Sequence, residues 1–176
     1  MKMSATRDIA ADPAIVWAAL LDRDVLKECV PGCTEMTGSA EEGFAATVVQ
    51  KVGPVKATFK GAVTLSDIVE GQSLTLSGEG KGGAAGFAKG GADVRLEPSE
   101  LGTLLSYDVD AKVGGKLAQL GSRIIDGFAK KMADQFFTRF QEAVEGPSDG
   151  EEDAVDEGAD TNGDAPKKGW FRKLVG

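Results

Sequence analysis

The sequence predicts an α+β domain in which a curved antiparallel sheet of about seven strands is covered by one long C-terminal helix. Two observations predict this fold class. Between residues 34 and 113 the apolar side chains alternate with polar ones, the period of a strand with one wet face. Between residues 115 and 145 the apolar period lengthens to three or four, the period of an amphipathic helix.

The chain opens with one strand and two short helices. Residues 3–9 alternate between apolar and polar side chains, which predicts a half-buried strand. Asp12-Pro13 then supplies an N-cap and a first-turn proline for a short helix. Asp22 restarts the chain into a second helix, and Pro31-Gly32 ends it.

The middle of the chain alternates with period two over several segments separated by turns. Its hairpins are predicted at the glycine-containing pairs Glu42-Gly43, Gly53-Pro54, Glu70-Gly71 and Leu101-Gly102. The alternating segments themselves are residues 44–49, 55–66, 73–77, 92–96 and 105–113. Residues 34–113 are thus expected to form about six strands, which with the first strand make about seven, and the outer face of their sheet is expected to be polar.

The predicted helix spans Gly115 to Glu145, about 45 Å at ~1.5 Å per residue. Its apolar stripe is Leu117, Leu120, Ile124, Phe128, Met132, Phe136, Phe140 and Val144, widened by Ile125 and Phe137. A helix of this length needs a broad apolar surface to lie on, and the inner face of the sheet supplies it.

Several inner-face positions of the sheet carry small residues, namely Ala46, Ala57, Gly61, Ala92 and Ala111. Small residues opposite a helix rich in phenylalanine predict a partly empty, apolar interior that could hold a ligand. The alternative is a solid core in which the helix sits closer to the sheet. By phase and size, the candidate lining residues are Phe59, Phe87, Tyr107, Leu120, Ile124 and Phe128, and plain core packing is the alternative role for each.

The segment from Gly78 to Gly91 holds seven glycines in fourteen residues. It lacks the pattern of a phosphate-binding loop. One interpretation is a mobile hairpin at the mouth of the cavity with Phe87 at its tip; the other is a bend that curls the sheet.

Charge and cysteine content exclude several functions. The net charge is −8 and the body shows no basic stripe, which argues against nucleic acid as a partner. Cys29 and Cys33 lack a second pair of ligands and the chain has no histidine, so neither a metal site nor catalytic residues are predicted. Asp110 and Glu79 are placed on the outer face by their phase. No long apolar run or signal peptide is present, so we expect a cytoplasmic protein with reduced thiols.

The end of the chain changes composition twice. Residues 146–165 contain eight acidic and no basic residues among glycine, serine and alanine, which predicts a disordered linker. Residues 166–176 contain four basic residues and an adjacent tryptophan and phenylalanine, which predicts an amphipathic anchor on an anionic membrane; a solvated terminus is the alternative. The anchor residues are Lys167, Lys168, Trp170, Phe171, Arg172, Lys173, Leu174 and Val175.

Three stretches resemble a known family. Residues 9–22, with Asp12-Pro13 and Val16-Trp17, together with Cys29-Val30-Pro31-Gly32-Cys33 and the glycine-rich hairpin, resemble the CoxG family, named for the G subunit of carbon monoxide dehydrogenase, over roughly residues 1–145. That family belongs to the START/Bet v 1-like (SRPBCC) superfamily. The resemblance implies its helix-grip fold, in which a sheet wraps around a long C-terminal helix.

The resemblance also implies a function. CoxG proteins are non-catalytic accessory proteins that recruit a molybdenum-containing hydroxylase of the CO dehydrogenase type to the inner face of the cytoplasmic membrane. They are associated with a lipophilic ligand, for which an isoprenoid quinone, ubiquinone or menaquinone, is expected here rather than a covalently bound cofactor. The alternatives are an enzyme of the same fold acting on a hydrophobic substrate, and a membrane adaptor without ligand.

Overall fold

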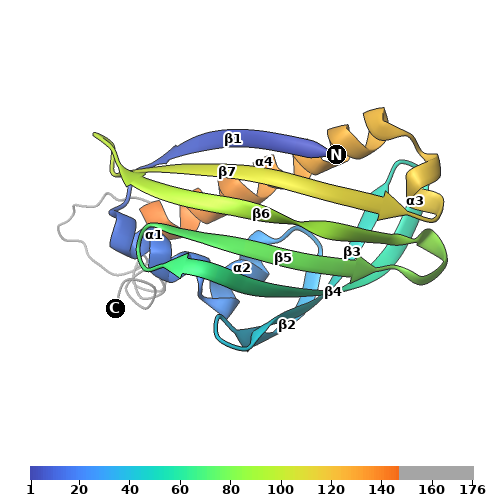
Figure 1. Ribbon diagram of the computed structural model, residues 1–176, viewed down its shortest axis with the longest axis horizontal. Coiled ribbons are helices and arrows are strands. Elements are labelled where there is room, and N and C mark those ends of the chain that lie inside the picture. Colours follow the sequence, from blue (N-terminus) through green and yellow to red (C-terminus); the bar gives the residue numbers. More distant parts are fainter. Residues whose placement is uncertain (147–176) are drawn as a thin grey trace, which may run out of the picture.

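The structure is a computed structural model that describes residues 1–146 of the chain. It has two layers: a seven-stranded antiparallel sheet in the order β1-β7-β6-β5-β4-β3-β2, and a long helix, α4, across its inner face (Figure 1). The predicted helix-grip architecture is therefore confirmed. The linker predicted after Gly146 and the membrane segment predicted at 166–176 lie outside the described residues.

The elements follow one another with short connections. The strands are β1 (Lys2–Ile9), β2 (Cys33–Ser39), β3 (Gly43–Val52), β4 (Val55–Val69), β5 (Ser73–Lys81), β6 (Phe87–Pro98) and β7 (Thr103–Gly114). The helices are α1 (Pro13–Leu20), α2 (Arg23–Cys29), the 3₁₀ turn η1 (Gly83–Ala85), α3 (Lys116–Gln119) and α4 (Ser122–Glu145). None of the helices in residues 1–146 combines the length and the apolar composition needed to cross a bilayer.

The two short helices begin where the sequence predicts, but only α2 has a capping side chain at its start. The side chain of Asp22 caps α2 by accepting hydrogen bonds from the backbone N–H groups of Asp24 (2.8 Å) and Val25 (3.2 Å). Asp12 occupies the N-cap position of α1, but its side chain makes no capping hydrogen bond. Pro13 at the first position, with its fixed φ, marks the start of α1 instead.

The predicted single helix from Gly115 to Glu145 is interrupted. It is divided into α3 and α4 by Gly121, whose φ of 90° lies in the left-handed region that side chains rarely adopt. Within α4, Ile125 and Phe137 are buried, while Ile124 is 41% exposed.

The largest side chains meet at one end of the sheet, which we call the core end, next to α1, α2 and the C-terminus of α4. Phe140 is fully buried there, and its ring stacks on Phe136 with centroids 5.7 Å apart. Tyr107 from β7 stacks on Phe137 from α4 at 5.2 Å. The core end therefore has a solid aromatic and aliphatic core.

The opposite end of the sheet, which we call the cavity end, carries the β3–β4 hairpin, η1 and α3 (Figure 1). The glycine-rich segment lies here. Its tip is η1 rather than Phe87, which begins β6, and most of its glycines continue β5 and β6. A smaller apolar cluster of Val52, Leu117 and Ile125 closes this end.

Candidate functional site

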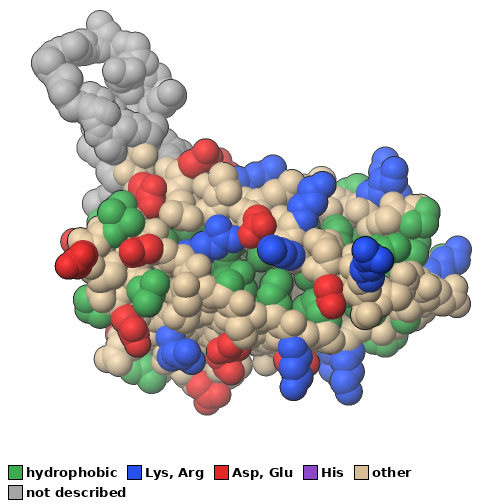
Figure 2. Space-filling model, turned by 90° about the horizontal axis from the view of Figure 1, so that it is seen from above, with side chains coloured by type: hydrophobic (Ala, Val, Ile, Leu, Met, Phe, Trp, Pro, Cys, Tyr) green, Lys and Arg blue, Asp and Glu red, His purple; other side chains and the backbone are tan. Residues whose placement is uncertain are grey.

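An apolar cavity of about 280 Å³ lies between the inner face of the sheet and the helices at the cavity end. It is open to solvent on one side. Its walls are formed by Met1, Val48, Gln50, Val52, Phe59, Gly80, Ala88, Ala111, Val113, Leu117, Ile125, Phe128, Ala129 and Met132. Figure 2, seen from the β1 side, shows hydrophobic side chains recessed between charged ones near the middle of this face.

The cavity exists because the inner face of the sheet loses its large side chains toward this end. Gly61, Gly80 and Ala88 face one another across β4, β5 and β6. A second row joins Gly78, Gly90 and Ala111. Since α4 rests on the large side chains of the core end, it cannot approach the sheet closely enough to fill the space above these small residues. The hollow interior predicted from small inner residues is thus present, with Ala111 in its wall.

The structure places two of the six predicted lining residues in the cavity wall, Phe59 from β4 and Phe128 from α4. Phe59 lies flat against the backbone just after β5, where a Cβ at Gly82 would be 2.4 Å from its ring. Leu120 packs against the cluster of Val52 and Leu117 but is not part of the wall.

The other three predicted residues lie elsewhere. Tyr107 belongs to the core end, where it stacks on Phe137. Ile124 is 41% exposed and lies outside the cavity wall, beside the β3–β4 turn, where its Cγ2 would be 3.5 Å from a Cβ at Gly53. Phe87 is 41% exposed on the outer face of the sheet, since its neighbour Ala88 points inward. Contact of any of the six with a ligand stays a prediction.

Several wall residues were missed by the sequence reasoning. Gly80 and Ala88 were overlooked because the search was for large side chains, although Gly78 and Gly90, two residues away on the same face, are a signal of an empty inner face. Ala129 and Met132 complete the helical wall, one turn and two turns beyond Ile125.

The wall contains one polar side chain, Gln50, and that group is already engaged. Its amide nitrogen donates a hydrogen bond of 2.5 Å to the backbone oxygen of Pro31. The surface that faces the cavity is therefore apolar. Glu79 and Asp110 are exposed on the outer face, as their phase predicted. The cavity wall offers no side chain for acid–base chemistry, but it suits a lipophilic guest.

The two cysteines lie near α2 and away from the cavity. Burial, and then the neighbouring carboxylate of Glu28, raise the pKa of Cys29 to about 12, so its thiol stays protonated. The Cys33 thiol is half-buried and donates to the backbone oxygen of Glu35 at 3.3 Å. Within residues 1–146, no three His, Cys, Asp or Glu side chains gather in a way that could hold a metal ion.

A second hollow lies between α2, the start of β2 and α4. Charged side chains line it, among them Asp24, Lys27, Glu28 and Arg139. Its polar lining is unsuited to a lipophilic molecule. The apolar cavity is therefore the candidate functional site.

Comparisons with known proteins agree with this arrangement. The family model described as the G subunit of carbon monoxide dehydrogenase (CoxG) matches residues 6–145. A search of functionally curated proteins finds no match.

Solved structures with the same fold come from several bacteria. A conserved protein of Geobacillus kaustophilus is 27% identical, with a TM-score of 0.75 over 81% of this chain and 93% of that one. Proteins of Chromobacterium violaceum (17% identity, TM-score 0.61, 82% of this chain and 97% of that one) and Thermus thermophilus (15%, 0.62, 81% and 95%) share the fold alone.

Proposed function

Because the chain belongs to the CoxG family of carbon monoxide dehydrogenase subunits, we propose that it holds an isoprenoid quinone in its apolar cavity and recruits a molybdenum hydroxylase of the CO dehydrogenase type to the cytoplasmic membrane. The family model by itself supports an accessory role associated with carbon monoxide dehydrogenase.

The apolar wall of the cavity is the single observation that carries the ligand part of the proposal. A volume of about 280 Å³ is slightly below the range of roughly 300–1,000 Å³ typical of ligand pockets. It suits a ring with the first part of an attached chain rather than a whole isoprenoid lipid. The rest of the chain would leave through the open side.

The wall chemistry also favours a carrier over an enzyme. Its side chains are aliphatic or aromatic except for Gln50, whose amide is held by Pro31. A quinone bound there would receive its two electrons from the partner enzyme and its two protons from water. The protein's own part is to shield the guest from water and present it.

The membrane part of the proposal comes from the last eleven residues. Four basic residues near an anionic surface contribute about 1 kcal/mol each, and Trp170 and Phe171 can lie at the headgroup level. The protein would therefore be peripheral on the inner face of the cytoplasmic membrane. If residues 146–165 form a flexible linker as the sequence predicts, the root-mean-square reach of the anchor from the domain would be roughly 25 Å.

The experiment that tests the ligand is extraction of protein purified from its native host. Denaturation in organic solvent followed by mass spectrometry should release an isoprenoid lipid in proportion to the protein. A protein that is repeatedly empty, or that releases only bulk membrane lipids, contradicts the quinone and leaves a membrane adaptor without ligand.

Deletion of residues 166–176 is expected to separate the two roles. Attachment to vesicles that contain phosphatidylglycerol should fall by at least tenfold, because four cations and two aromatic anchors are removed. The lipid recovered per protein and the binding of the partner enzyme should not change, because the cavity lies within residues 1–145. Loss of all three together would contradict this division.

A further inference from the structure

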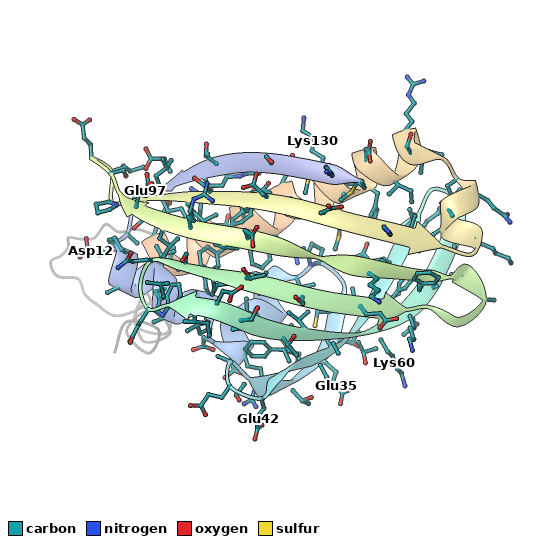
Figure 3. The ribbon with its side chains drawn as sticks, viewed as in Figure 1. Asp12, Glu35, Glu42, Lys60, Glu97 and Lys130 are labelled. Carbon is teal, nitrogen blue, oxygen red and sulfur yellow. The ribbon has the colours of Figure 1, made fainter. Side chains whose placement is uncertain are left out.

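Six lysines lie together on the outer face of the sheet at the cavity end. They are Lys51, Lys56, Lys60, Lys81, Lys89 and Lys112, from strands β3 to β7, and all are exposed. We call this group the lysine face. Figure 3 shows Lys60 pointing away from the sheet there, whereas Glu97 and Asp12 lie at the core end. The sequence alone shows no basic stripe because these lysines come from five different strands.

The lysines oppose one another directly across neighbouring strands. Lys51 faces Lys56, and Lys60 faces Lys81. Like charges in directly opposed positions destabilise a sheet. Lys89 also faces Lys112, with the carboxylate of Glu79 on its other side. None of the six forms an ion pair within the part of the chain that the structure describes.

The same sheet shows how an opposed pair of like charges is compensated elsewhere. Asp93 faces Asp108 in the middle of the outer face. Asp93 accepts a hydrogen bond of 2.8 Å from the Thr75 hydroxyl, and Asp108 is contacted by Ser4 and, at 3.9 Å, by Arg95. The pairs Lys51–Lys56 and Lys60–Lys81 have no such compensation from the described residues, so the lysine face is complementary to an anionic surface outside the domain.

An exposed aromatic ring lies within the lysine face. Phe87 is directly opposite Lys81 on one side and Gly114 on the other. Its ring covers the backbone of Gly114, where a Cβ would lie 2.2 Å away, yet 41% of the residue remains exposed. An aromatic ring among lysines is the combination found in segments that lie at a membrane interface.

We propose that the lysine face, with Phe87, docks the folded domain onto an anionic lipid bilayer, separately from the C-terminal tail. This inference deepens the membrane part of the proposed function and rests on it. All six cations are lysines, whereas arginine is the residue enriched at protein interfaces and in nucleic-acid recognition and lysine is depleted at protein interfaces. Lysine is a strongly hydrated point charge, which suits a fluid layer of headgroups.

The position of the lysine face determines which end of the domain would face the lipid. It lies on the outer side of the strands whose inner side forms the cavity, since Gly80 and Ala88 alternate with Lys81 and Phe87. Docking would hold the cavity end, rather than the core end, next to the lipid. Because the sheet itself would lie between the bilayer and the cavity, a lipophilic guest would have to pass around the edge of the sheet.

The test uses the full chain and the triple variant Lys56→Gln, Lys60→Gln, Lys81→Gln. Binding to phosphatidylcholine vesicles containing phosphatidylglycerol, without quinone, is measured by co-sedimentation. Each lysine near such a surface contributes roughly fivefold to partitioning, so the triple variant should bind roughly 100-fold more weakly. The matched control Lys27→Gln, Lys130→Gln, Lys131→Gln changes net charge equally and should bind nearly as the parent does.

A second pair of variants tests the aromatic contact. Phe87→Ala should weaken vesicle binding severalfold, while Ile68→Ala, which removes an apolar side chain of similar exposure from β4 near the core end, should not. The thermal unfolding temperature of the triple variant should be no lower than that of the parent, because opposed lysines are removed.

Three outcomes overturn the inference. In the first, the triple variant binds vesicles as tightly as the parent. In the second, the control variant loses as much affinity as the triple variant, which would indicate an effect of net charge alone. In the third, the triple variant keeps vesicle binding but no longer binds the partner enzyme, which would assign the lysine face to an acidic protein. Each is distinguishable from failure of the proposed function, because quinone extraction and the tail deletion are measured independently of these lysines.

Discussion

Replacement of Gly80 by leucine is expected to abolish lipid retention while stabilising the fold. Gly80 lines the cavity, and no heavy atom lies within 4 Å of a Cβ built at this position. A leucine can therefore enter the cavity without displacing its neighbours. Filling an apolar void and replacing a glycine within a strand both stabilise, together by about 0.5–2 kcal/mol.

The measurement compares the isoprenoid lipid recovered per protein and the free energy of unfolding in urea. Gly127→Ala is the matched control, because Gly127 in α4 is exposed and also has open space at its Cβ. It should gain about 1 kcal/mol from helix propensity and keep its lipid. A Gly80→Leu protein that is stable and still retains lipid would place the ligand outside this cavity.

Truncation of Phe140 to alanine is expected to cause the largest loss of stability, about 3–5 kcal/mol. Phe140 is fully buried and lies between Phe136 and Phe137, with ring centroids 5.7 and 6.3 Å away. A loss of this size approaches the whole stability of many domains, so Phe140→Leu provides a milder variant if the alanine variant does not fold.

Phe128→Ala supplies the comparison, since it removes the same atoms from the same helix. Phe128 borders the cavity, where one side of its ring already lacks packing partners. It should lose less than half as much stability as Phe140→Ala in chemical denaturation, yet retain less lipid. Equal losses of stability would contradict the division of α4 into a core half and a cavity half.

The sheet could be predicted from the sequence because its signals are local. Alternation with period two identifies each strand, and a pair such as Gly53-Pro54 both ends one strand and starts the next. The turn then sets the register, with Val52 facing Val55. The helix-grip arrangement could be predicted because the apolar side of one amphipathic helix and the apolar face of one sheet can each cover the other.

The phase of the helix could not be predicted with the same accuracy. Ile124 and Ile125 are both apolar, and a search for apolar residues at steps of three or four accepts both. Repeated steps of four drift around a helix of 3.6 residues per turn, so that Ile124 lies about 160° from Phe140 and Ile125 only about 60°. Ile125 rather than Ile124 therefore contacts the cavity.

The lysine face and the small-residue rows were missed for a common reason. Each is formed by residues from several strands that become neighbours only through the register. Lys60 and Lys81, for example, are separated along the chain by a full hairpin. A sequence reading that counts charges or searches for large side chains along the chain does not detect such groups.

The short helix α3 is joined to the rest of the protein by a glycine at each end, Gly115 with φ 72° and Gly121 with φ 90°. It contributes Leu117 to the cavity wall, yet its backbone hydrogen bonds are independent of those that hold α4 together. Substitutions in the four residues of α3 or in its two flanking glycines could therefore change the size of the cavity without changing the core end. Relatives with the same aromatic core could then accommodate ligands of different size.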